Sequence, residues 1–330
     1  MRSTLFGKRA AAFAACAVVA AALVPQPACA QTWPAKPVRI IVTFPPGGGL
    51  DFFTRIAAVK LQENLGQQFV VENRGGAGGM IGAEAGAKAP PDGYTVTFAS
   101  SAEITINQHL YPKIAYDSTK DFVPVSYAAY APLLFSVHPS LPVKSLKELV
   151  ALARSRPGQL NYASAGTGGS QHLAGELLKS SARIDILHVP YKGAGPAVVD
   201  MVGGHVSMGF TALPSSLPQA RAGKLRPIAV TSAKRSEGAP DLATFAELGF
   251  PQIDLVVWYG VLYPARTPPE IVNRMSSEIA RAVHAPDVKA KLIQQGVESV
   301  GSTPAEFAKF MQSEIQRYGK LIRESGAKAD

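Results

Sequence analysis

The chain has 330 residues, 47% of them hydrophobic, and a formal net charge of +9 at neutral pH. A chain of this length can bury one large core or two smaller ones without a covalent cross-link. Its two cysteines, Cys16 and Cys29, lie in an N-terminal segment that we expect to be removed. Disulfides, thiol nucleophiles and cysteine-ligated metal sites are then excluded from the mature chain.

Residues 1–30 have the pattern of a secretory signal peptide. Three basic residues precede an apolar run at residues 10–24, and the small residues Ala28 and Ala30 stand where a signal peptidase cuts. We therefore expect export, with cleavage after Ala30. A membrane anchor is one alternative, although about 15 apolar residues are fewer than the roughly 20 that a bilayer requires. A lipoprotein modified at Cys29 is the other.

The basic charge of the chain is dispersed. Removing Arg2, Lys8 and Arg9 with the signal peptide lowers the 33 basic residues to 30, against 24 acidic ones. No run of Lys and Arg is longer than the pair Lys234-Arg235, whereas nucleic-acid-binding proteins gather such residues on one face. We interpret the charge as a solvated basic surface and expect no nucleic-acid partner.

Strand-like and helix-like segments alternate along the chain, which predicts βαβ units and a mostly parallel sheet. Three helix starts have the sequence of a capping box, with Ser145, Thr267 and Thr303 as N-cap residues and Glu three positions later. The expected strands are residues 38–42, 69–71, 95–98, 133–137, 160–163, 186–189, 206–210, 228–231 and 255–263.

Two glycine-rich loops join an expected strand to an expected helix, one at residues 44–51 and one at 164–170. Glycine lets the backbone approach a ligand closely, and the free N–H groups at a helix start attract an anion. We expect Asp51 to cap the first of these helices. Facing each other, the two loops would suit a carboxylate. The alternative, that the glycines serve only tight turns, stays open.

A third glycine-rich segment, residues 73–82, only partly matches a dinucleotide-binding fingerprint, because Ile81 stands where the third glycine belongs. We interpret it as a structural loop or a wall of a cleft. The sequence has no P-loop, no H-E-x-x-H and no G-x-S-x-G, and its six histidines lack metal-ligand spacing. We therefore expect no cofactor, no metal and no catalytic residue. His172 and His188 flank the second loop, and we expect structural roles for both.

Several motifs in order along the chain are similar to those of one family. They are PVRIIVTFPPGGGLD at residues 37–51, VENRGGAGG at 71–79, PDGYT at 91–95, NYAS at 161–164, HLAGEL at 172–177, HVPYKG at 188–193, GKLR at 223–226, AVTS at 229–232 and WYG at 258–260. With these motifs the chain resembles the Bug receptors, the extracytoplasmic solute-binding proteins of tripartite tricarboxylate transporters.

The resemblance implies a periplasmic receptor with the two-lobed, type II periplasmic-binding-protein fold, in which each lobe is a mixed, mostly parallel sheet flanked by helices. One lobe would combine residues 31–131 with 252–330, and the other would span 132–251. The ligand would be a small carboxylate, namely a dicarboxylate, an amino acid or an aromatic acid. Membrane transporter subunits would be the partners of a monomeric receptor, with a role in sensing as the alternative to transport. The implied ligand-binding residues are Phe44, Pro45, Gly47, Gly48, Gly49, Asp51, Ser100, Ser101, Ser164, Gly166, Thr167, Gly168, Gly169, Ser170, His172, Tyr191, Lys192 and Gly193.

The first loop departs from the usual family pattern. Leu50 replaces a small polar residue, and the pair Phe52-Phe53 is bulkier than usual. We therefore hypothesise a pocket that favours an aromatic or otherwise apolar-bodied acid.

Two functions other than that of a receptor are alternatives. The first is an exported ester or amide hydrolase with Ser164 or Ser170 as nucleophile and His172 as base, for which the sequence offers no elbow motif. The second, a nucleotide-binding oxidoreductase, is disfavoured by the incomplete fingerprint and by export.

Overall fold

The computed structural model describes residues 33–325, 327 and 328, which from Lys36 onward belong to one compact unit. The signal peptide expected at residues 1–30, its cleavage after Ala30 and the alternative of lipidation at Cys29 lie outside the described residues. Within the described residues, no helix combines the length and the apolar composition needed to cross a membrane.

β-Branched residues dominate the first strand, β1 (Val38–Val42), because their side chains fit a pleated, buried surface. Ten strands of the described residues join in the order β2-β1-β3-β9-β4-β7-β5-β6, with β8 and β10 also paired to β4. The other strands are β2 (Phe69–Asn73), β3 (Thr95–Ser100), β4 (Phe122–Val137), β5 (Leu160–Ser164), β6 (Ile186–Pro190), β7 (Met208–Ala212), β8 (Arg226–Val230), β9 (Val256–Pro264) and β10 (Glu298–Ser299).

The long strand β4 connects two halves of this sheet. Its part from Phe122 to Pro132 pairs antiparallel with β9, whereas its end from Leu133 to Val137 pairs antiparallel with β7 and β8. In the first half β1 pairs parallel with β2 and β3, and in the second half β5 pairs parallel with β6 and β7. Each half thus has a parallel βαβ core joined to antiparallel strands.

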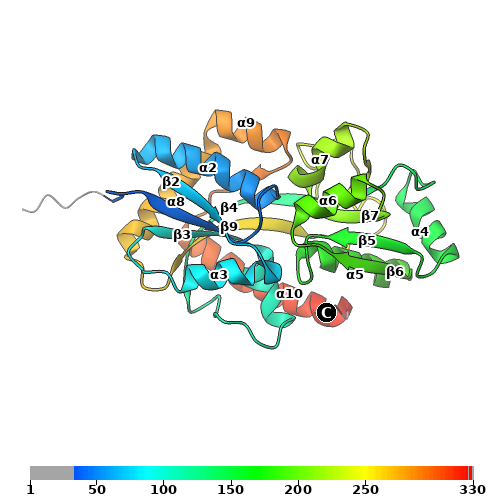
Figure 1. The fold of residues 1–330 in the computed structure, drawn as a ribbon, viewed down its shortest axis with the longest axis horizontal. Helices are drawn as coiled ribbons and strands as arrows, with labels where there is room; N and C mark the ends of the chain where they lie inside the picture. Colours follow the sequence, from blue (N-terminus) through cyan, green and yellow to red (C-terminus); the bar gives the residue numbers. More distant parts are fainter. Residues whose placement is uncertain (1–32, 326, 329–330) are drawn as a thin grey trace, which may run out of the picture. The chain divides into compact units, whose positions relative to one another are not determined.

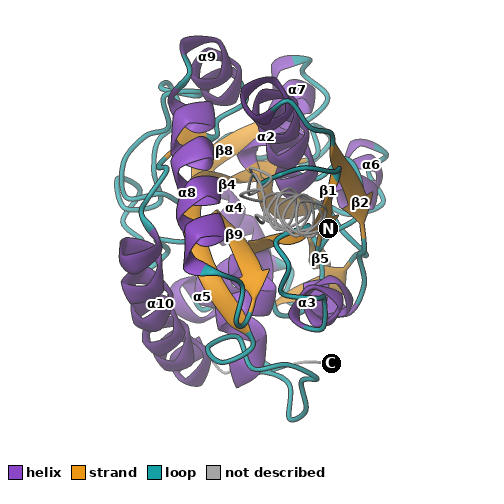
Figure 2. Cartoon of the chain, turned by 90° about the vertical axis from the view of Figure 1, so that its left-hand side faces the viewer, coloured by secondary structure: helices purple, strands orange, loops and turns teal. Residues whose placement is uncertain are grey.

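Helices cover both faces of each half (Figure 1), and the side view shows α8 and α10 lying beside β9 (Figure 2). Such helices are the crossover connections that two parallel strands require, because the chain must return to the same end of the sheet before the next strand begins. The helices are α2 (Gly49–Leu65), α3 (Met80–Ala87), α4 (Leu146–Ser155), α5 (Ser170–Ala182), α6 (Ala194–Val202), α7 (Leu213–Arg221), α8 (Pro269–His284), α9 (Pro286–Gln294) and α10 (Pro304–Ser325).

Aromatic rings fill the core of each half. In the first half the ring of Phe53 packs against Phe98 and stacks on Tyr259, with ring centroids 6.1 and 5.5 Å apart. In the second half Phe210 stacks on Phe135, with centroids 4.5 Å apart, and on Phe245. All six rings are fully buried, so each half has its own apolar centre.

Most expected elements are confirmed, whereas β10 was not expected and several element ends differ. The strand expected at 133–137 is only the end of β4, which begins at Phe122, and β7 begins two residues later than expected. Ser145 and Thr303 accept hydrogen bonds from the glutamate amides three positions later, as capping boxes do. Thr267 was wrong as an N-cap: α8 begins after Pro268, and the Thr267 hydroxyl donates to the carbonyl of Pro264 instead.

Candidate functional site

Both glycine-rich loops end in a helix that no side chain caps. The N-cap residue of α2 is Gly48, with φ −87° and ψ 168°, and that of α5 is Gly169, with φ −89° and ψ 167°. Neither receives a side-chain cap. The amides in the opening turn of a helix have no intrahelical acceptor. Two strand–loop–helix units with nearly identical N-cap geometry therefore leave uncapped backbone donors at their helix starts.

A third uncapped helix start lies beside them. Helix α6 follows Gly193, which has φ 113° and again no side-chain cap. The Gly193 amide donates to the carbonyl of Ala165 at 2.9 Å, and the Tyr191 amide donates to that of Ser164 at 3.1 Å. These bonds fix the start of α6 against the second glycine-rich loop. The resemblance implied that Gly193 binds the ligand, but no helix start was expected there.

The three helix starts meet at one cavity, which we call the first cavity, with an empty volume of about 470 Å³ that includes open solvent at its mouth. Every residue that lines it is uncharged, so its polarity comes from backbone groups, hydroxyls and one amide. Its lining residues are Phe44, Pro45, Gly48, Gly49, Leu50, Ser100, Ser101, Ala102, Ala165, Ser170, Gln171, Gly193, Ala194, Ala212, Val257 and Tyr259.

A second cavity, with an empty volume of about 620 Å³, shares Phe44, Pro45, Ala165 and Gly193 with the first. The third glycine-rich segment contributes residues 76–79 to its wall. The other lining residues are Tyr111, Gly166, Thr167, Pro190, Tyr191 and Lys192. The two cavities therefore adjoin along the first and second glycine-rich loops.

The structure brings most of the expected binding residues to these cavities. Phe44, Pro45, Gly48, Gly49, Ser100, Ser101, Ser170 and Gly193 line the first, and Gly166, Thr167, Tyr191 and Lys192 line the second. Within the described chain, Gly47, Asp51, Ser164, Gly168, Gly169 and His172 stand outside both linings. The sequence reasoning did not include Ala102, Ala165, Gln171, Ala194, Ala212, Val257 or Tyr259 among the binding residues.

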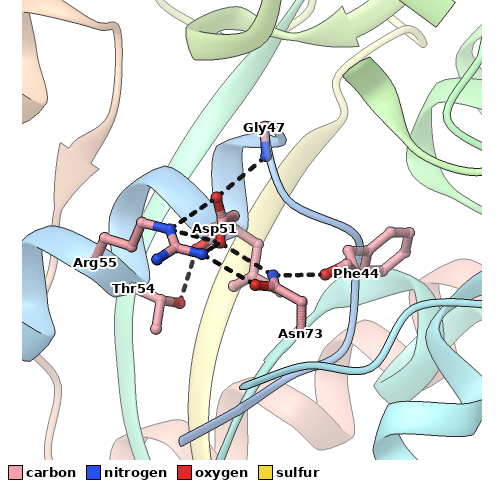
Figure 3. Close-up of polar contacts among 7 residues, drawn as sticks. Phe44, Gly47, Asp51, Thr54, Arg55 and Asn73 are labelled. Atoms are coloured by element: carbon pink, nitrogen blue, oxygen red, sulfur yellow. Dashed lines mark hydrogen bonds and ion pairs between the residues drawn. The ribbon is translucent and has the colours of Figure 1, made fainter. Parts of the chain in front are cut away.

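Asp51 does not cap α2, because it is the third residue of that helix and Gly48 is the N-cap. Its carboxylate instead accepts hydrogen bonds from the Gly47 amide at 3.1 Å, from Arg55 Nε at 3.0 Å and from Asn73 Nδ2 at 3.0 Å (Figure 3). Asn73 Nδ2 also donates to the carbonyl of Phe44 at 2.9 Å. Asp51 therefore holds the first glycine-rich loop in place and is itself occupied by protein donors.

The electrostatics of Asp51 agree with this role. Burial raises the pKa of its carboxyl, but hydrogen bonds from Arg55, Gly47 and Asn73 more than offset burial and lower the pKa below the usual 3.8. The carboxylate is thus ionised at neutral pH, and Arg55 balances its charge at 3.0 Å. The Asp51–Arg55 ion pair therefore has little net charge, so Asp51 does not strongly repel an anion at the start of α2.

Glu103, a buried acid that the sequence did not point to, binds the backbone and the side chain of Ser100. Glu103 is 1% exposed and accepts hydrogen bonds from the Thr43 hydroxyl at 2.5 Å, the Ser100 amide at 2.5 Å and the Ser100 hydroxyl at 2.8 Å. Burial raises the pKa of Glu103 to about 7, against the lowering effect of these bonds. Glu103 therefore fixes the end of β3 where it meets the first cavity.

The serines and histidines near the second loop pair in a way that the hydrolase hypothesis did not predict. Ser164 Oγ bonds to Nε2 of His188 at 2.7 Å, and the ring of His172 stacks on that of His188 with centroids 4.2 Å apart. Ser170 Oγ bonds to Ser101 Oγ at 3.1 Å.

Among the described residues, no three His, Cys, Asp or Glu side chains gather in a way that could hold a metal ion.

The bulky residues of the first loop have different positions. Leu50 lines the first cavity, so its apolar side chain forms part of the wall. Phe53 instead packs in the core against Phe98 and Tyr259. Leu50 therefore contributes to the cavity wall itself, whereas Phe53 lies behind the wall and contacts the ring of Tyr259.

A sheet in two halves and a cavity lined by the starts of three helices define a solute-binding protein with the two-lobed, type II periplasmic-binding-protein fold. Comparison with solved structures agrees. The periplasmic binding protein BugD is 29% identical, with a TM-score of 0.86 over 90% of this chain and 100% of BugD. Rpa4515 of R. palustris, solved with adipate, is 37% identical, with a TM-score of 0.88 over 90% of this chain and 100% of that chain.

Sequence comparison identifies the family. The model described as "Tripartite tricarboxylate transporter family receptor" matches residues 53–327. Protein BugT of Bordetella pertussis is 40% identical over 311 residues, which cover 94% of this chain and 95% of BugT. The chain belongs to the tripartite tricarboxylate transporter receptor family, and the resemblance to the Bug receptors is confirmed.

Proposed function

We propose that this protein captures a small organic acid with an apolar body in the first cavity and delivers it to membrane subunits of a tripartite tricarboxylate transport system. The observation that supports this function best is the meeting of three uncapped helix starts at one cavity. Backbone amides at helix starts bind carboxylates well because the helix dipole adds to their hydrogen bonds. No covalent step is required.

The lining of the first cavity narrows the ligand class. Its wall has no carboxylate that would balance an ammonium group, so an amino acid would bury an uncompensated charge. Leu50, Val257 and several alanines provide apolar contacts. An aliphatic diacid such as adipate, the molecule found with the relative Rpa4515, fits both properties. We therefore propose that acids without an ammonium group bind most tightly.

Capture would proceed by closure of two lobes on the ligand. We propose residues 31–131 with 252–330 as one lobe and 132–251 as the other, a division supported by the change of partners along β4 at Pro132. Contacts between these parts are present at the cavities: Ser101 Oγ bonds to Ser170 Oγ at 3.1 Å, and Tyr111 Oη donates to the carbonyl of Thr167 at 3.4 Å. A ligand that touches both parts stabilises the closed state.

Calorimetric titration of the purified mature protein, without its bound ligand, tests this function. Adipate, malate, benzoate and glutamate are the probes, and adipamide is the neutral control for adipate. We expect adipate to bind, glutamate to bind more weakly, and adipamide to give no heat. A ligand at 100 times its dissociation constant should also add about 2.7 kcal/mol to the free energy of unfolding, measured by thermal shift. Binding of adipamide as tight as that of adipate would contradict the proposal.

A further inference from the structure

Tyr259 of β9 brings to the first cavity a hydroxyl that has no hydrogen-bond partner among the described residues. The side chain is 1% exposed, so bulk solvent does not replace the missing partner. Buried polar groups are nearly always hydrogen-bonded, because an unsatisfied one destabilises the fold. An unpaired hydroxyl in the wall of a cavity therefore indicates a partner that occupies that cavity.

The other hydroxyls of the same wall are already hydrogen-bonded within the protein. Ser100 donates to Glu103 Oε2 at 2.8 Å, and Ser101 and Ser170 bond to each other at 3.1 Å. Among the described residues, the Tyr259 hydroxyl is thus the one in this lining that has no hydrogen-bond partner. This contrast separates Tyr259 from a wall residue that merely fills space.

The Tyr259 hydroxyl lies at the start of α2. A Cβ added to Gly49, the first residue of that helix, would collide with the hydroxyl oxygen, and it would also lie 2.9 Å from Cγ of Pro214. The hydroxyl therefore lies close to the backbone of Gly49, beside the uncapped amides of the opening turn. A hydroxyl beside several amides adds a donor to the same anion site.

The surrounding residues keep this donor in position. Phe53 stacks on the Tyr259 ring with centroids 5.5 Å apart and an interplanar angle of 23°, and pairing with Ser100 fixes the strand. Burial raises the pKa of Tyr259 above its ordinary value of 10. The phenol consequently keeps its proton at neutral pH and acts as a donor.

We propose that the Tyr259 hydroxyl donates a hydrogen bond to the ligand carboxylate that is held at the start of α2, and that this contact makes Tyr259 a specificity-determining residue. The inference rests on the proposed function and deepens it. Because the phenol hydrogen needs an acceptor, the contact favours a carboxylate over an ammonium group or an apolar terminus at this end of the cavity. Gly49 would then be required because any side chain there displaces the hydroxyl.

The substitution Tyr259→Phe tests the proposal, with Tyr263→Phe as the matched control. Tyr263 lies on the same strand and is equally buried, but its hydroxyl donates to the carbonyl of Gly93 at 3.2 Å. Adipate is titrated calorimetrically into the wild type and both variants, and the Tm of each unliganded protein is measured. We expect Tyr259→Phe to raise the Kd for adipate about tenfold to a hundredfold, as for a lost hydrogen bond to a charged group. Its Tm should stay equal or rise.

The control Tyr263→Phe should show the opposite pair of effects. Its Tm should fall because it loses the hydrogen bond to Gly93, and its Kd should stay within about twofold of the wild type because Tyr263 is outside the lining of the first cavity. If Tyr259→Phe binds adipate as tightly as the wild type, the inference is wrong while the proposed function stands. A fall in the Tm of Tyr259→Phe as large as that of the control would also overturn it, by revealing a partner within the protein. If the wild type binds none of adipate, malate and benzoate, the proposed function itself fails, and the inference with it.

Discussion

Adding a side-chain cap to α2 should stabilise the protein and weaken ligand binding by roughly two orders of magnitude. The N-cap Gly48 has φ −87° and ψ 168°, an extended conformation that any residue adopts. A Cβ at this position would meet only the carbonyl oxygen of Pro45, at 3.9 Å, which is an ordinary contact. Gly48→Asp therefore fits without strain. Its carboxylate would accept hydrogen bonds from the amides of the first turn of α2, which we assign to the ligand.

The two effects of Gly48→Asp have different sizes. Capping adds a few tenths of a kcal/mol relative to glycine, and the stiffer unfolded chain adds about 0.4–1 kcal/mol. The expected gain in the free energy of unfolding is about 1 kcal/mol, which raises the Tm by roughly 2–4 °C. Against this, a carboxylate about 5 Å from the ligand carboxylate costs about 3 kcal/mol at an effective dielectric constant near 20. The Kd for adipate should therefore rise by roughly 200-fold.

Three variants at this position separate the causes. Gly48→Ala adds only a Cβ and should leave the Kd for adipate within about threefold of the wild type. Gly48→Asn adds a neutral cap and should raise it by about tenfold, because the amides are occupied without charge repulsion. Calorimetry gives the Kd values, and thermal unfolding without ligand gives the Tm values. Equal Kd values for the alanine and aspartate variants would refute the assignment of these amides to the ligand.

Two further predictions concern carboxyl groups. Burial raises the pKa of Glu103 from 4.5 to about 7, so its contribution to stability is fully present below pH 4.5 and is lost as the pH rises through 7. In the wild type the free energy of unfolding should fall by up to about 3 kcal/mol over that pH range, and Glu103→Gln should remove this fall. Urea titration at each pH measures it, and the exposed control Glu148→Gln should keep the fall. If the free energy of unfolding of Glu103→Gln depends on pH as that of the wild type does, burial of Glu103 is not its cause. The pKa of Asp51 is lowered, so its contribution is present above the unfolded value of about 3.9 and is lost as the pH falls below it. Asp51→Asn should be less stable than the wild type by about 1–2 kcal/mol at pH 7, a small figure because Arg55 is half exposed. This difference should vanish in acid. Equal stability at pH 7 would show that the hydrogen bond to Gly47 and the ion pair with Arg55 do not stabilise the protein.

The fold was largely predictable because its strands are short β-branched runs next to glycine. The strand expected at residues 38–42 coincides with β1. The start of β4 was missed because Pro124 and Pro132 interrupt its sequence, and proline normally argues against a central strand. In the structure the pairing of β4 with β9 shifts register near Pro124, and this irregularity accommodates the proline. Such an adjustment depends on the neighbouring strand and has no local signal.

The glycine-rich loops were predictable as parts of the candidate site, but the residues behind them were not. The start of α6 carries Gly195 and Pro196, which are weak helix formers and gave no helix signal. Tyr259 comes from a strand about 200 residues after the first loop, and its role depends on packing against Gly49, which only the folded chain reveals. Glu103 became notable only when burial and three donors around its carboxylate were known.

We propose that backbone amides at the starts of separate helices hold the ligand carboxylates. A ¹H–¹⁵N correlation spectrum of the mature protein, recorded during titration with adipate, reports on each of these amides individually. We predict that the amide protons of Gly49, Leu50, Ser170 and Ala194 shift downfield as they donate to the carboxylates, while those of the distant helix α4 stay in place. Saturable binding of adipate that leaves these four amides unmoved would contradict the claim.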